Sequence, residues 1–356
     1  MAATDKQVQK AGIRALRVSA ADVARAVGVS PATVSYVLNG RDGVSQEMRE
    51  RVLKTAQELG HIPSARARRL REQRTRVIGL VLTDIANPFY TEIAAGTVDS
   101  ARARGYEVFF AHTQENAETL DNVIDTMIAR NVDGVVLTVL HPDDGEVIRR
   151  IRRAHIPFVQ LSRRIPFLEA DFVGIDDSAA AVELMHHVLD HGYEDVALVA
   201  GPRNSTASAA RVDGFRAAAR ARRIPLPADR ITSTYLSEAG GRRAASRLLD
   251  ADPLPRAIVC GSDAIAAGVI GALALRGVRV PEDVAVTGFD GLFPEASPLA
   301  ALTTVNQPRR DMAGVALDLL VHRIDGVGGA YQSLIQPHEL RIGTTCGCPL
   351  RTEPIG

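Results

Sequence analysis

Tryptophan is absent from this 356-residue sequence, and aromatic side chains make up only 4% of it. Long apolar runs are missing too, because none approaches the roughly 20 residues that a membrane-spanning helix requires. The first residues lack the apolar core of a secretory signal peptide. We therefore expect no contact with a membrane, no export and a cytoplasmic location. The 46% hydrophobic content still allows a small head and a larger body.

Cysteine is scarce, with only Cys260, Cys346 and Cys348 in the chain. So few cysteines suit a reducing compartment. Cys260 ends the apolar run AIVC and is expected to be a small buried residue. Cys346 and Cys348 flank one glycine, and we see no partnering cluster of histidine or cysteine for them. The sequence therefore predicts no metal site and no cofactor.

Motifs of the common enzyme classes are missing as well. The sequence contains no nucleophile motif, no phosphate-binding loop and no HExxH. His186, His187 and His191 occur in a stretch with helical spacing of apolar residues, and we expect them to face solvent or the end of that helix. An enzyme is therefore a poor interpretation of this chain.

The net charge is zero, but the charges are unevenly distributed. Residues 1–76 carry 15 Lys and Arg against 7 Asp and Glu, whereas the remaining chain carries 27 against 35. A basic N-terminal part on an acidic body favours binding to phosphates, because each neutralised phosphate releases counterions. Residues 1–17 are basic without apolar periodicity and are expected to be a disordered extension.

Two short helices are predicted directly after this extension. Ser19 is a plausible N-cap for the first, whose apolar positions recur at helical spacing up to Gly28. Ser30 caps the second, Pro31 occupies its first position, and Asn39 with Gly40 ends it. Two helices joined by so tight a turn form a helix-turn-helix, whose second helix can enter the major groove of DNA.

A third helix is predicted from Ser45 to about Leu59. Its apolar side chains are expected to be buried: Met48, Val52, Leu53, Ala56 and Leu59. In the second helix, Pro31, Ala32 and Tyr36 share a face and are candidates for reading bases. The candidates for contacts with the DNA backbone, or for caps, are Ser30, Thr33, Ser35 and Asn39.

From Val77 onward, apolar runs alternate with stretches of helical periodicity. The candidate strands are 77–82, 107–111, 134–139, 158–161 and 172–175, followed by 196–200, 231–235, 256–260 and 284–289. Two such halves predict an α/β body of two lobes, each a parallel sheet with helices on both faces. Ligands of such sheets bind at the carboxyl ends of strands, so a cleft between the lobes is the expected binding site.

The segments GVSPATVSYVLNG, PSARARRL and VIGLVLTDIANPFY resemble the lactose-repressor/galactose-repressor (LacI/GalR) family of bacterial transcription regulators. The resemblance extends over roughly residues 18–345. It implies an N-terminal all-α helix-turn-helix head and hinge helix joined to a two-lobed body like that of periplasmic binding proteins. It also implies that the chain crosses between the lobes three times.

The expected domains follow from these signals and from the resemblance. The head covers 18–62, the hinge helix and linker 63–76, the effector-binding and dimerisation body 77–345, and the C-terminal tail 346–356. The first lobe comprises about 77–175 plus 306–336, and the second about 176–305 plus 337–345. In the hinge, the resemblance implies minor-groove contacts by Ser64, Ala67, Arg68 and Leu70, with Leu70 wedged between bases.

The resemblance also assigns residues to the cleft. Arg211 aligns with the ligand-holding arginine of the family and Asp290 with its ligand-holding carboxylate. A guanidinium and a carboxylate offer fixed donors and acceptors to a polyhydroxylated ligand. The further matched positions are Thr83, Asp176, Ser262, Asp263 and Gln307, and Asp176 is expected chiefly to hold Arg211. Aromatic side chains beside strand ends are nominated as walls, with a core role as the alternative for each: Phe89, Tyr90, Tyr235 and Phe289.

One cleft position departs from the family pattern. Many members place Asp followed by Arg where this chain has Ser162, Arg163 and Arg164. The loss of that carboxylate raises the local positive potential, which suits a sugar without the usual hydroxyl contact or a ligand with an acidic group. The alternative is that Arg163 simply points to solvent.

The sequence thus predicts a DNA-binding transcriptional regulator, a repressor, controlled by a small effector in the cleft. We expect a homodimer rather than a tetramer, because the C-terminal leucine heptad of tetrameric relatives is missing. The two-fold symmetry of a dimer in turn predicts a near-palindromic operator. An extracytoplasmic solute-binding protein is the alternative, but it would need a signal peptide and has no use for residues 18–71. A sugar-like catabolite that releases DNA is favoured, while co-repression, as in the purine-responsive members, stays open.

Overall fold

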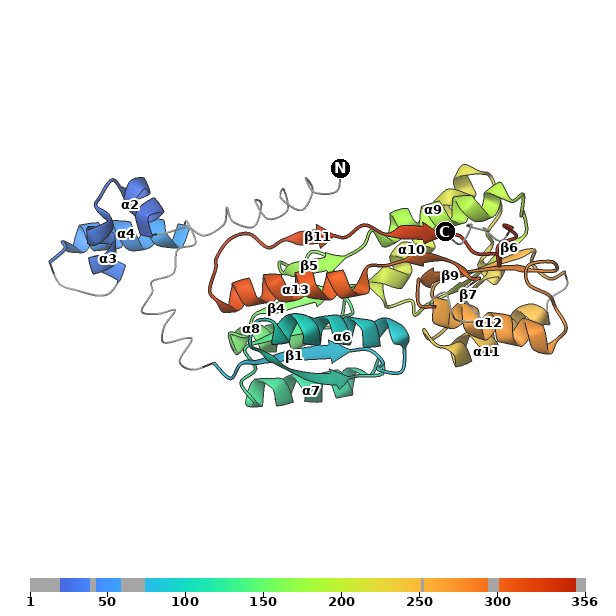
Figure 1. The fold of residues 1–356 in the computed structure, drawn as a ribbon, viewed down its shortest axis with the longest axis horizontal. Coiled ribbons are helices and arrows are strands. Elements are labelled where there is room, and N and C mark those ends of the chain that lie inside the picture. Colours follow the sequence, from blue (N-terminus) through green and yellow to red (C-terminus); the bar gives the residue numbers. More distant parts are fainter. Residues whose placement is uncertain (1–19, 39–42, 59–73, 251–252, 294–300, 350–356) are drawn as a thin grey trace, which may run out of the picture.

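A computed structural model describes residues 20–38, 43–58, 74–250, 253–293 and 301–349 of the chain (Figure 1). Several expectations lie outside these residues. They concern the extension 1–17, Ser19, Asn39, Gly40, Leu59 and the hinge residues Ser64, Ala67, Arg68 and Leu70.

The head consists of three helices, α2 (Ala20–Val27), α3 (Pro31–Leu38) and α4 (Gln46–Glu58). Gly28 ends α2 with a φ of 78°, a left-handed conformation that glycine adopts without strain. The Oγ of Ser30 accepts a hydrogen bond from the backbone N of Thr33 at 3.1 Å and caps α3. Val23, Val34 and Val52 contribute one side chain from each helix to the core of the head. The predicted helix-turn-helix is therefore confirmed.

Leu53 was expected to be buried in this core and is not. Its side chain is 44% exposed, whereas the adjacent Val52 is fully buried. Met48, Val52 and Ala56 follow one another at intervals of four residues, so they lie on the same face of α4. Leu53 lies about 100° around the helix from Val52 and therefore leaves that face.

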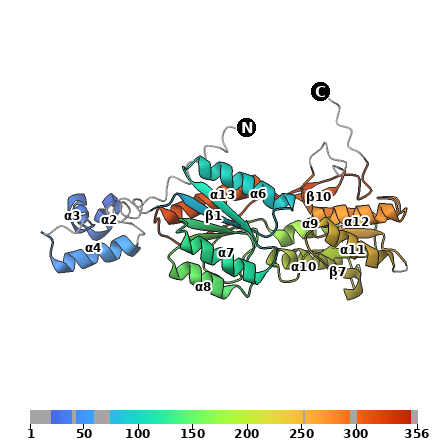
Figure 2. The ribbon, with the colours of Figure 1, turned by 90° about the horizontal axis from the view of Figure 1, so that it is seen from below.

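The first lobe contains a six-stranded parallel sheet in the order β11-β5-β4-β3-β1-β2. Its strands are β1 (Val77–Leu82), β2 (Glu107–His112), β3 (Gly134–Leu137), β4 (Phe158–Leu161), β5 (Asp171–Gly174) and β11 (Ser333–Ile335). The helices α6 (Pro88–Arg102) and α13 (Arg309–Ile324) pack together on one face, and α7 (Ala117–Ala129) and α8 (Gly145–Arg153) on the other (Figure 2).

The second lobe has a sheet in the order β12-β10-β9-β8-β6-β7, in which only β12 is antiparallel to its neighbour. Its strands are β6 (Val196–Ala200), β7 (Ile231–Ser233), β8 (Ala257–Cys260), β9 (Ala285–Asp290), β10 (Thr303–Asn306) and β12 (Glu339–Arg341). The helices α9 (Asp177–Asp190) and α10 (Thr206–Ala221) pack together, as do α11 (Glu238–Leu249) and α12 (Asp263–Leu275); η2 (Ala228–Arg230) precedes β7.

The chain passes between the two sheets three times. It leaves the first sheet after β5, returns after β10 and leaves again after β11. The largest apolar cluster contains side chains of both lobes, such as Ile93 of α6 and Phe215 of α10. The two lobes therefore share a continuous core around these crossings.

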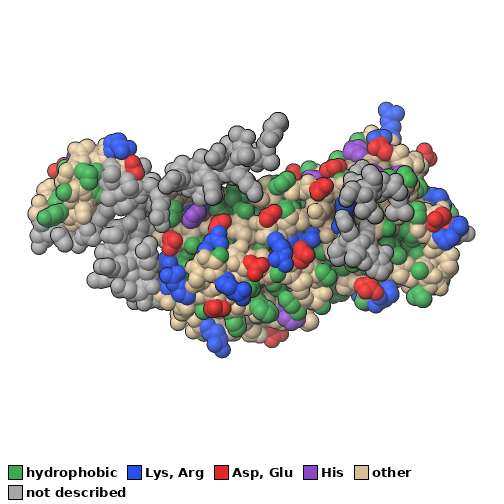
Figure 3. Space-filling view, in the orientation of Figure 1, with side chains coloured by type: hydrophobic (Ala, Val, Ile, Leu, Met, Phe, Trp, Pro, Cys, Tyr) green, Lys and Arg blue, Asp and Glu red, His purple; other side chains and the backbone are tan. Residues whose placement is uncertain are grey.

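The predicted two-lobed α/β architecture is confirmed, and its long strands lie within one or two residues of their expected positions. Three strands were not expected from the sequence: the buried four-residue β10 and the partly exposed β11 and β12, which have three residues each. Among the described helices, none has the length and apolarity needed to cross a membrane. Basic and acidic side chains are interspersed on the face of the body shown in Figure 3.

Candidate functional site

A narrow cavity lies where the carboxyl ends of strands from both sheets meet. Its volume is about 20 Å³, which accommodates a water molecule but not a sugar. Its lining comprises Asn87, Phe89, Tyr90, Ser162, Arg163, Ser205, Ala207, Ser208, Arg211, Leu236 and Asp290. Six of these residues were predicted from the sequence. A larger ligand requires the lobes to separate or these side chains to move.

Arg211 of α10 is the centre of this site, and its side chain is only 7% exposed. Its Nε donates to Oδ1 of Asp177 at 2.7 Å, and its Nη1 donates to Oδ1 of Asp290 at 3.2 Å. Nη1 also donates to the carbonyl oxygen of Gly261 at 2.7 Å. The guanidinium carbon lies 3.8 Å from the centroid of the Phe289 ring, a cation–π contact. These contacts fix the guanidinium in one orientation at the cavity wall.

Asp290 ends β9 with a φ of 122°, a conformation that is rare for residues other than glycine. Nε2 of Gln307 donates to its Oδ1 at 2.8 Å, and Arg309 donates to its backbone oxygen. Burial raises the pKa of Asp290 to about 7, although Arg211 opposes the rise. A strained residue with a shifted pKa in a cleft is typical of a functional site.

Asp176 was expected to hold Arg211, and the structure assigns that contact to Asp177. The exposed carboxylate of Asp176 accepts a hydrogen bond from the backbone N of Ala179 at 2.9 Å and so caps α9. An N-cap residue lies outside the helix and directs its side chain to the first turn. Asp177 is therefore the residue that turns toward Arg211.

Arg163 does not point to solvent, because its side chain is only 2% exposed. Its Nη1 and Nη2 donate to the two carboxylate oxygens of Glu115 at 3.0 and 2.7 Å, and Nη2 also donates to the Tyr90 hydroxyl at 3.3 Å. Glu115 follows β2 and was not predicted as a site residue. Its charge offsets that of Arg163, so the expected excess of positive potential is not realised.

Hydrogen bonds connect the two lobes across the cleft. His141 of the first lobe places Nε2 at 2.8 Å from Oε2 of Glu115 and Nδ1 at 3.0 Å from the carbonyl oxygen of Asn204 in the second lobe. The hydrogen bond with Glu115 raises the pKa of His141. Burial opposes ionisation of Glu115, but hydrogen bonds from His141 and Arg163 lower its pKa to about 2. Asn87 adds a further link, from Nδ2 to the carbonyl oxygen of Leu236 at 3.0 Å.

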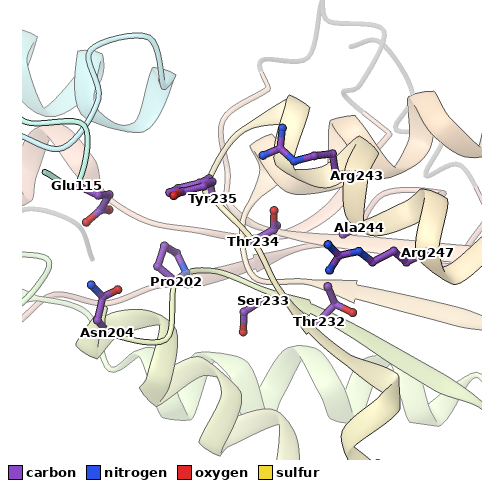
Figure 4. A pocket seen from close by; sticks show the side chains of 10 residues that line it. All are labelled: Glu115, Pro202, Asn204, Thr232, Ser233, Thr234, Tyr235, Arg243, Ala244 and Arg247. Carbon is purple, nitrogen blue, oxygen red and sulfur yellow. The ribbon is translucent and has the colours of Figure 1, made fainter.

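A second, wider cavity of about 430 Å³ adjoins the contacts of His141, because Glu115 and Asn204 both line it. Figure 4 shows Glu115 reaching toward Tyr235 and Pro202, with Arg243 and Arg247 projecting from α11. Tyr235 was nominated as a wall of the effector cavity, but it lines this second cavity and is 62% exposed.

The other predicted cleft residues are buried behind the cavity rather than lining it. Oγ of Ser262 caps α12 by accepting from the backbone N of Ile265 at 3.2 Å. Asp263 accepts hydrogen bonds from the Thr304 hydroxyl at 2.5 Å and from the backbone N of Leu292 at 2.6 Å. Phe289 is fully buried beneath Arg211, and Oγ1 of the buried Thr83 has no hydrogen-bond partner among the described residues. These residues shape the site without facing the cavity.

In the head, the candidate base-reading residues lie on the outer surface of α3. Pro31 and Ala32 are exposed, and the Tyr36 side chain is 45% exposed. Among the candidates for backbone contacts, Ser30 and Ser35 are exposed and Thr33 is half-buried, with its hydroxyl 2.9 Å from that of Ser30.

The expectation that Cys346 and Cys348 lack partners was wrong. His187 of α9 and His191, the C-cap residue of that helix, lie beside them, and one ligand atom from each of the four residues lies within 4.8 Å of the others. His187 is therefore not turned to solvent but faces the thiols. The two histidines are close together in the sequence, and so are the two cysteines. Because 159 residues separate His187 from Cys346, neither pair alone revealed the cluster.

The chain matches two described protein families. Residues 20–64 match "Bacterial regulatory proteins, lacI family", and residues 75–341 match "Periplasmic binding proteins and sugar binding domain of LacI family". It is 31% identical over 321 residues to the HTH-type transcriptional regulator DegA of Bacillus subtilis, covering 90% of this chain and 95% of that protein. It is 32% identical over 306 residues to the ribose operon repressor of Escherichia coli K12, covering 85% and 92%.

Among solved structures, the chain is similar to the transcriptional regulator CelR in complex with cellobiose. The TM-score is 0.69 at 29% identity, and the match covers 92% of this chain and all of that one. The expectation of a regulator rather than an enzyme is thus confirmed by the family. With its helix-turn-helix head and two-lobed effector-binding body, the chain belongs to the LacI family of bacterial DNA-binding transcription regulators.

Proposed function

We propose that this protein is a transcriptional repressor that binds a near-palindromic operator as a homodimer and is controlled by a neutral, sugar-like ligand in the interlobe cavity. The observation that carries the proposal is the pair Arg211 and Asp290, both buried and both lining that cavity. A guanidinium and a carboxylate side by side provide directional donors and acceptors for several hydroxyl groups.

The charge balance of the cavity supports a neutral ligand. Arg163 is paired with Glu115, and Arg211 with Asp177 and Asp290. An acidic ligand would have to displace one of these carboxylates, whereas a hydroxylated ligand can donate to and accept from both. Phe89 and Tyr90 supply an aromatic wall, with ring centroids 5.1 Å apart. The names of two relatives, a ribose operon repressor and a cellobiose complex, point to the same ligand class.

The proposed control is a two-state equilibrium between lobe arrangements. A ligand shifts such an equilibrium only by its difference in affinity for the two states. The hydrogen bonds of His141 and Asn87 across the cleft are contacts that change when the lobes separate. The hinge residues, with Leu70 in the minor groove, would transmit the change to the DNA, and we favour release of DNA on ligand binding.

A thermal-shift screen of the full chain tests the ligand assignment, using pentoses, hexoses, disaccharides, polyols, sugar acids, nucleosides and purines. A ligand at 100 times its dissociation constant adds about 2.7 kcal/mol of stability. A neutral saccharide or polyol should give the largest shift and should weaken binding to selected operator fragments in a gel-shift assay. A larger shift with a purine or a sugar acid would contradict the proposal, as would tighter DNA binding with the saccharide.

A further inference from the structure

A cluster of two histidines and two cysteines lies far from the effector cavity, at the C-terminal end of α9. His187 lies in the last turn of α9, and His191, four residues later, is the C-cap residue of this helix. Their rings lie side by side with centroids 5.0 Å apart. Cys346 and Cys348 follow β12 and flank Gly347, whose φ of 101° turns the chain between them. Two pairs of potential zinc ligands, each close together in the sequence, thus meet in one place.

Three of the distances within the cluster lie close to the edge length of a tetrahedral site. Nε2 of His187 lies 3.2 Å from Sγ of Cys346 and 3.8 Å from Sγ of Cys348, and Nε2 of His191 lies 3.4 Å from Sγ of Cys348. Zinc binds sulfur at about 2.3 Å and imidazole nitrogen at about 2.0 to 2.1 Å, so a tetrahedral N···S edge measures about 3.6 Å. All four atoms lie within 4.8 Å of one another. One ion can therefore contact all four once the more distant pairs close by up to about an ångström.

Neighbouring residues hold the ligands in this arrangement. The Thr303 hydroxyl donates to Sγ of Cys346 at 3.0 Å, and the Tyr193 hydroxyl donates to the Cys346 carbonyl oxygen at 3.1 Å. The Tyr193 ring stacks on the His191 ring with centroids 5.8 Å apart. Such outer contacts orient the ligands of metal sites and tune their affinity.

We propose that His187, His191, Cys346 and Cys348 bind one Zn²⁺ ion in a structural site. Two sulfurs and two imidazole nitrogens in a tetrahedron are typical of zinc, and four protein ligands leave no open position for catalysis. Both thiols release a proton on binding, and the two thiolates balance the charge of the ion. The site fastens the segment after β12 to α9, the helix whose other end carries Asp177 of the effector site.

Metal analysis of the purified full chain tests this directly. The protein is prepared under reducing conditions without chelator or polyhistidine tag, and its zinc content is measured by inductively coupled plasma mass spectrometry. We expect about one zinc per chain. After removal of the metal, titration with Co²⁺ should produce the visible bands of tetrahedral cobalt and a thiolate-to-cobalt charge-transfer band.

Variants assign the metal to these residues. Cys348→Ser and His191→Gln should each lower the affinity for Zn²⁺ by more than about 100-fold, beyond the loss typical of an outer contact. His186→Gln alters the neighbouring histidine of α9, outside the cluster, and should leave affinity and spectrum unchanged. Circular dichroism checks that the variants fold.

Several results would overturn the site. One such result is that the unmodified protein binds neither Zn²⁺ nor Co²⁺ tightly. Another is that Cys348→Ser, His191→Gln and His186→Gln all have the same affinity for Zn²⁺. A Cys346–Cys348 disulfide, found by mass spectrometry in protein kept under reducing conditions, would also exclude it. The measurement with unmodified protein decides the question even if a variant fails to fold.

Discussion

Nδ1 of His141 lies 3.0 Å from the carbonyl oxygen of Asn204 and so connects the first lobe to the second. The other ring nitrogen contacts Glu115, which also pairs with Arg163. When His141 is protonated, both ring nitrogens donate, and Glu115 and Asn204 are each satisfied. Protonation of one imidazole thus strengthens an interlobe contact beside the effector cavity.

The contribution of this contact should depend on pH. Because folding raises the pKa of His141, its stabilisation is complete below the ordinary value of 6.5 and is lost as the pH rises through the raised pKa. The Glu115 contribution is present above 4.5 and is lost as the pH falls toward about 2. His141→Gln should therefore lower the free energy of unfolding by about 1.5 kcal/mol near pH 5.5 and by much less near pH 9.

Urea denaturation at both pH values measures this difference. His155→Gln is the matched control, because His155 is exposed after α8 and its replacement leaves the contact between His141 and Asn204 in place. An equal loss of stability in His141→Gln at the two pH values would mean that the imidazole acts as a neutral group.

Replacement of Asp290 should separate ligand binding from DNA binding. Asp290→Asn keeps the shape of the side chain but removes the charge that faces Arg211 and the cavity. We expect ligand affinity to fall by about 10- to 150-fold, equivalent to about 1.5 to 3 kcal/mol for a hydrogen bond to a charged group. Operator binding should change little. Isothermal titration with the most stabilising compound of the screen, together with a gel-shift assay, measures both.

The adjacent-carboxylate control for this prediction is Asp176→Asn. Asp176 caps α9 and is exposed, and Asn is an equally good N-cap, so ligand affinity should be preserved. If Asp290→Asn binds the compound as tightly as the unmodified protein, Asp290 does not hold the ligand.

Tyr36 should determine part of the operator sequence. It lies on the outer surface of α3 and offers one hydroxyl and an aromatic face rather than a guanidinium fork. Tyr36→Arg allows a bidentate contact with guanine, worth about 1 to 3 kcal/mol against other bases. Operators selected from a random library by this variant should contain a new preferred base in each half-site. An unchanged consensus would place Tyr36 against the DNA backbone.

The packing of α11 against α12 depends on glycine. A Cβ on Gly268 would lie 2.0 Å from the carbonyl oxygen of Glu238, whereas a Cβ on Gly271 of the same helix has no atom within 4 Å. Gly268→Ala should force the helices apart and cost about 1 to 3 kcal/mol. Gly271→Ala should stabilise the protein by about 0.5 to 1 kcal/mol, because alanine is the better helix former. Thermal unfolding followed by circular dichroism compares the two, and equal effects would contradict the packing argument.

Periodicity predicted most of the elements that bury complete faces, although not β10, whose first three residues are buried. Strands such as β1 and β6 are nearly continuous apolar runs, and Gly28 and Ser30 are local signals for the ends of helices in the head. The short strands β11 and β12 are held by neighbours distant in the sequence, Phe172 to Gly174 and Thr304 to Asn306, so no local pattern reveals them.

The residues of the candidate site likewise fall into those that the sequence could predict and those that only the structure identifies. Arg211 and Asp290 could be assigned from motifs, and they meet in the structure. The choice between Asp176 and Asp177 depended on where α9 begins, and one residue of difference exchanged their roles. Glu115 lies in the loop after β2, where no periodicity applies, and its function depends on Arg163, 48 residues away.

The last passage between the lobes limits how they can move. Only residues 336–338 separate β11 in the first sheet from β12 in the second. Four consecutive Cα steps of at most about 3.6 Å allow Ile335 and Glu339 to be no more than about 14 Å apart. Pro337 stiffens this tether, and His338 anchors it to Glu183 of α9, with Nε2 and Oε2 3.0 Å apart. On this side, therefore, the lobes cannot be pulled apart as rigid blocks. Any separation of the lobes must therefore be a rotation about this edge rather than a translation.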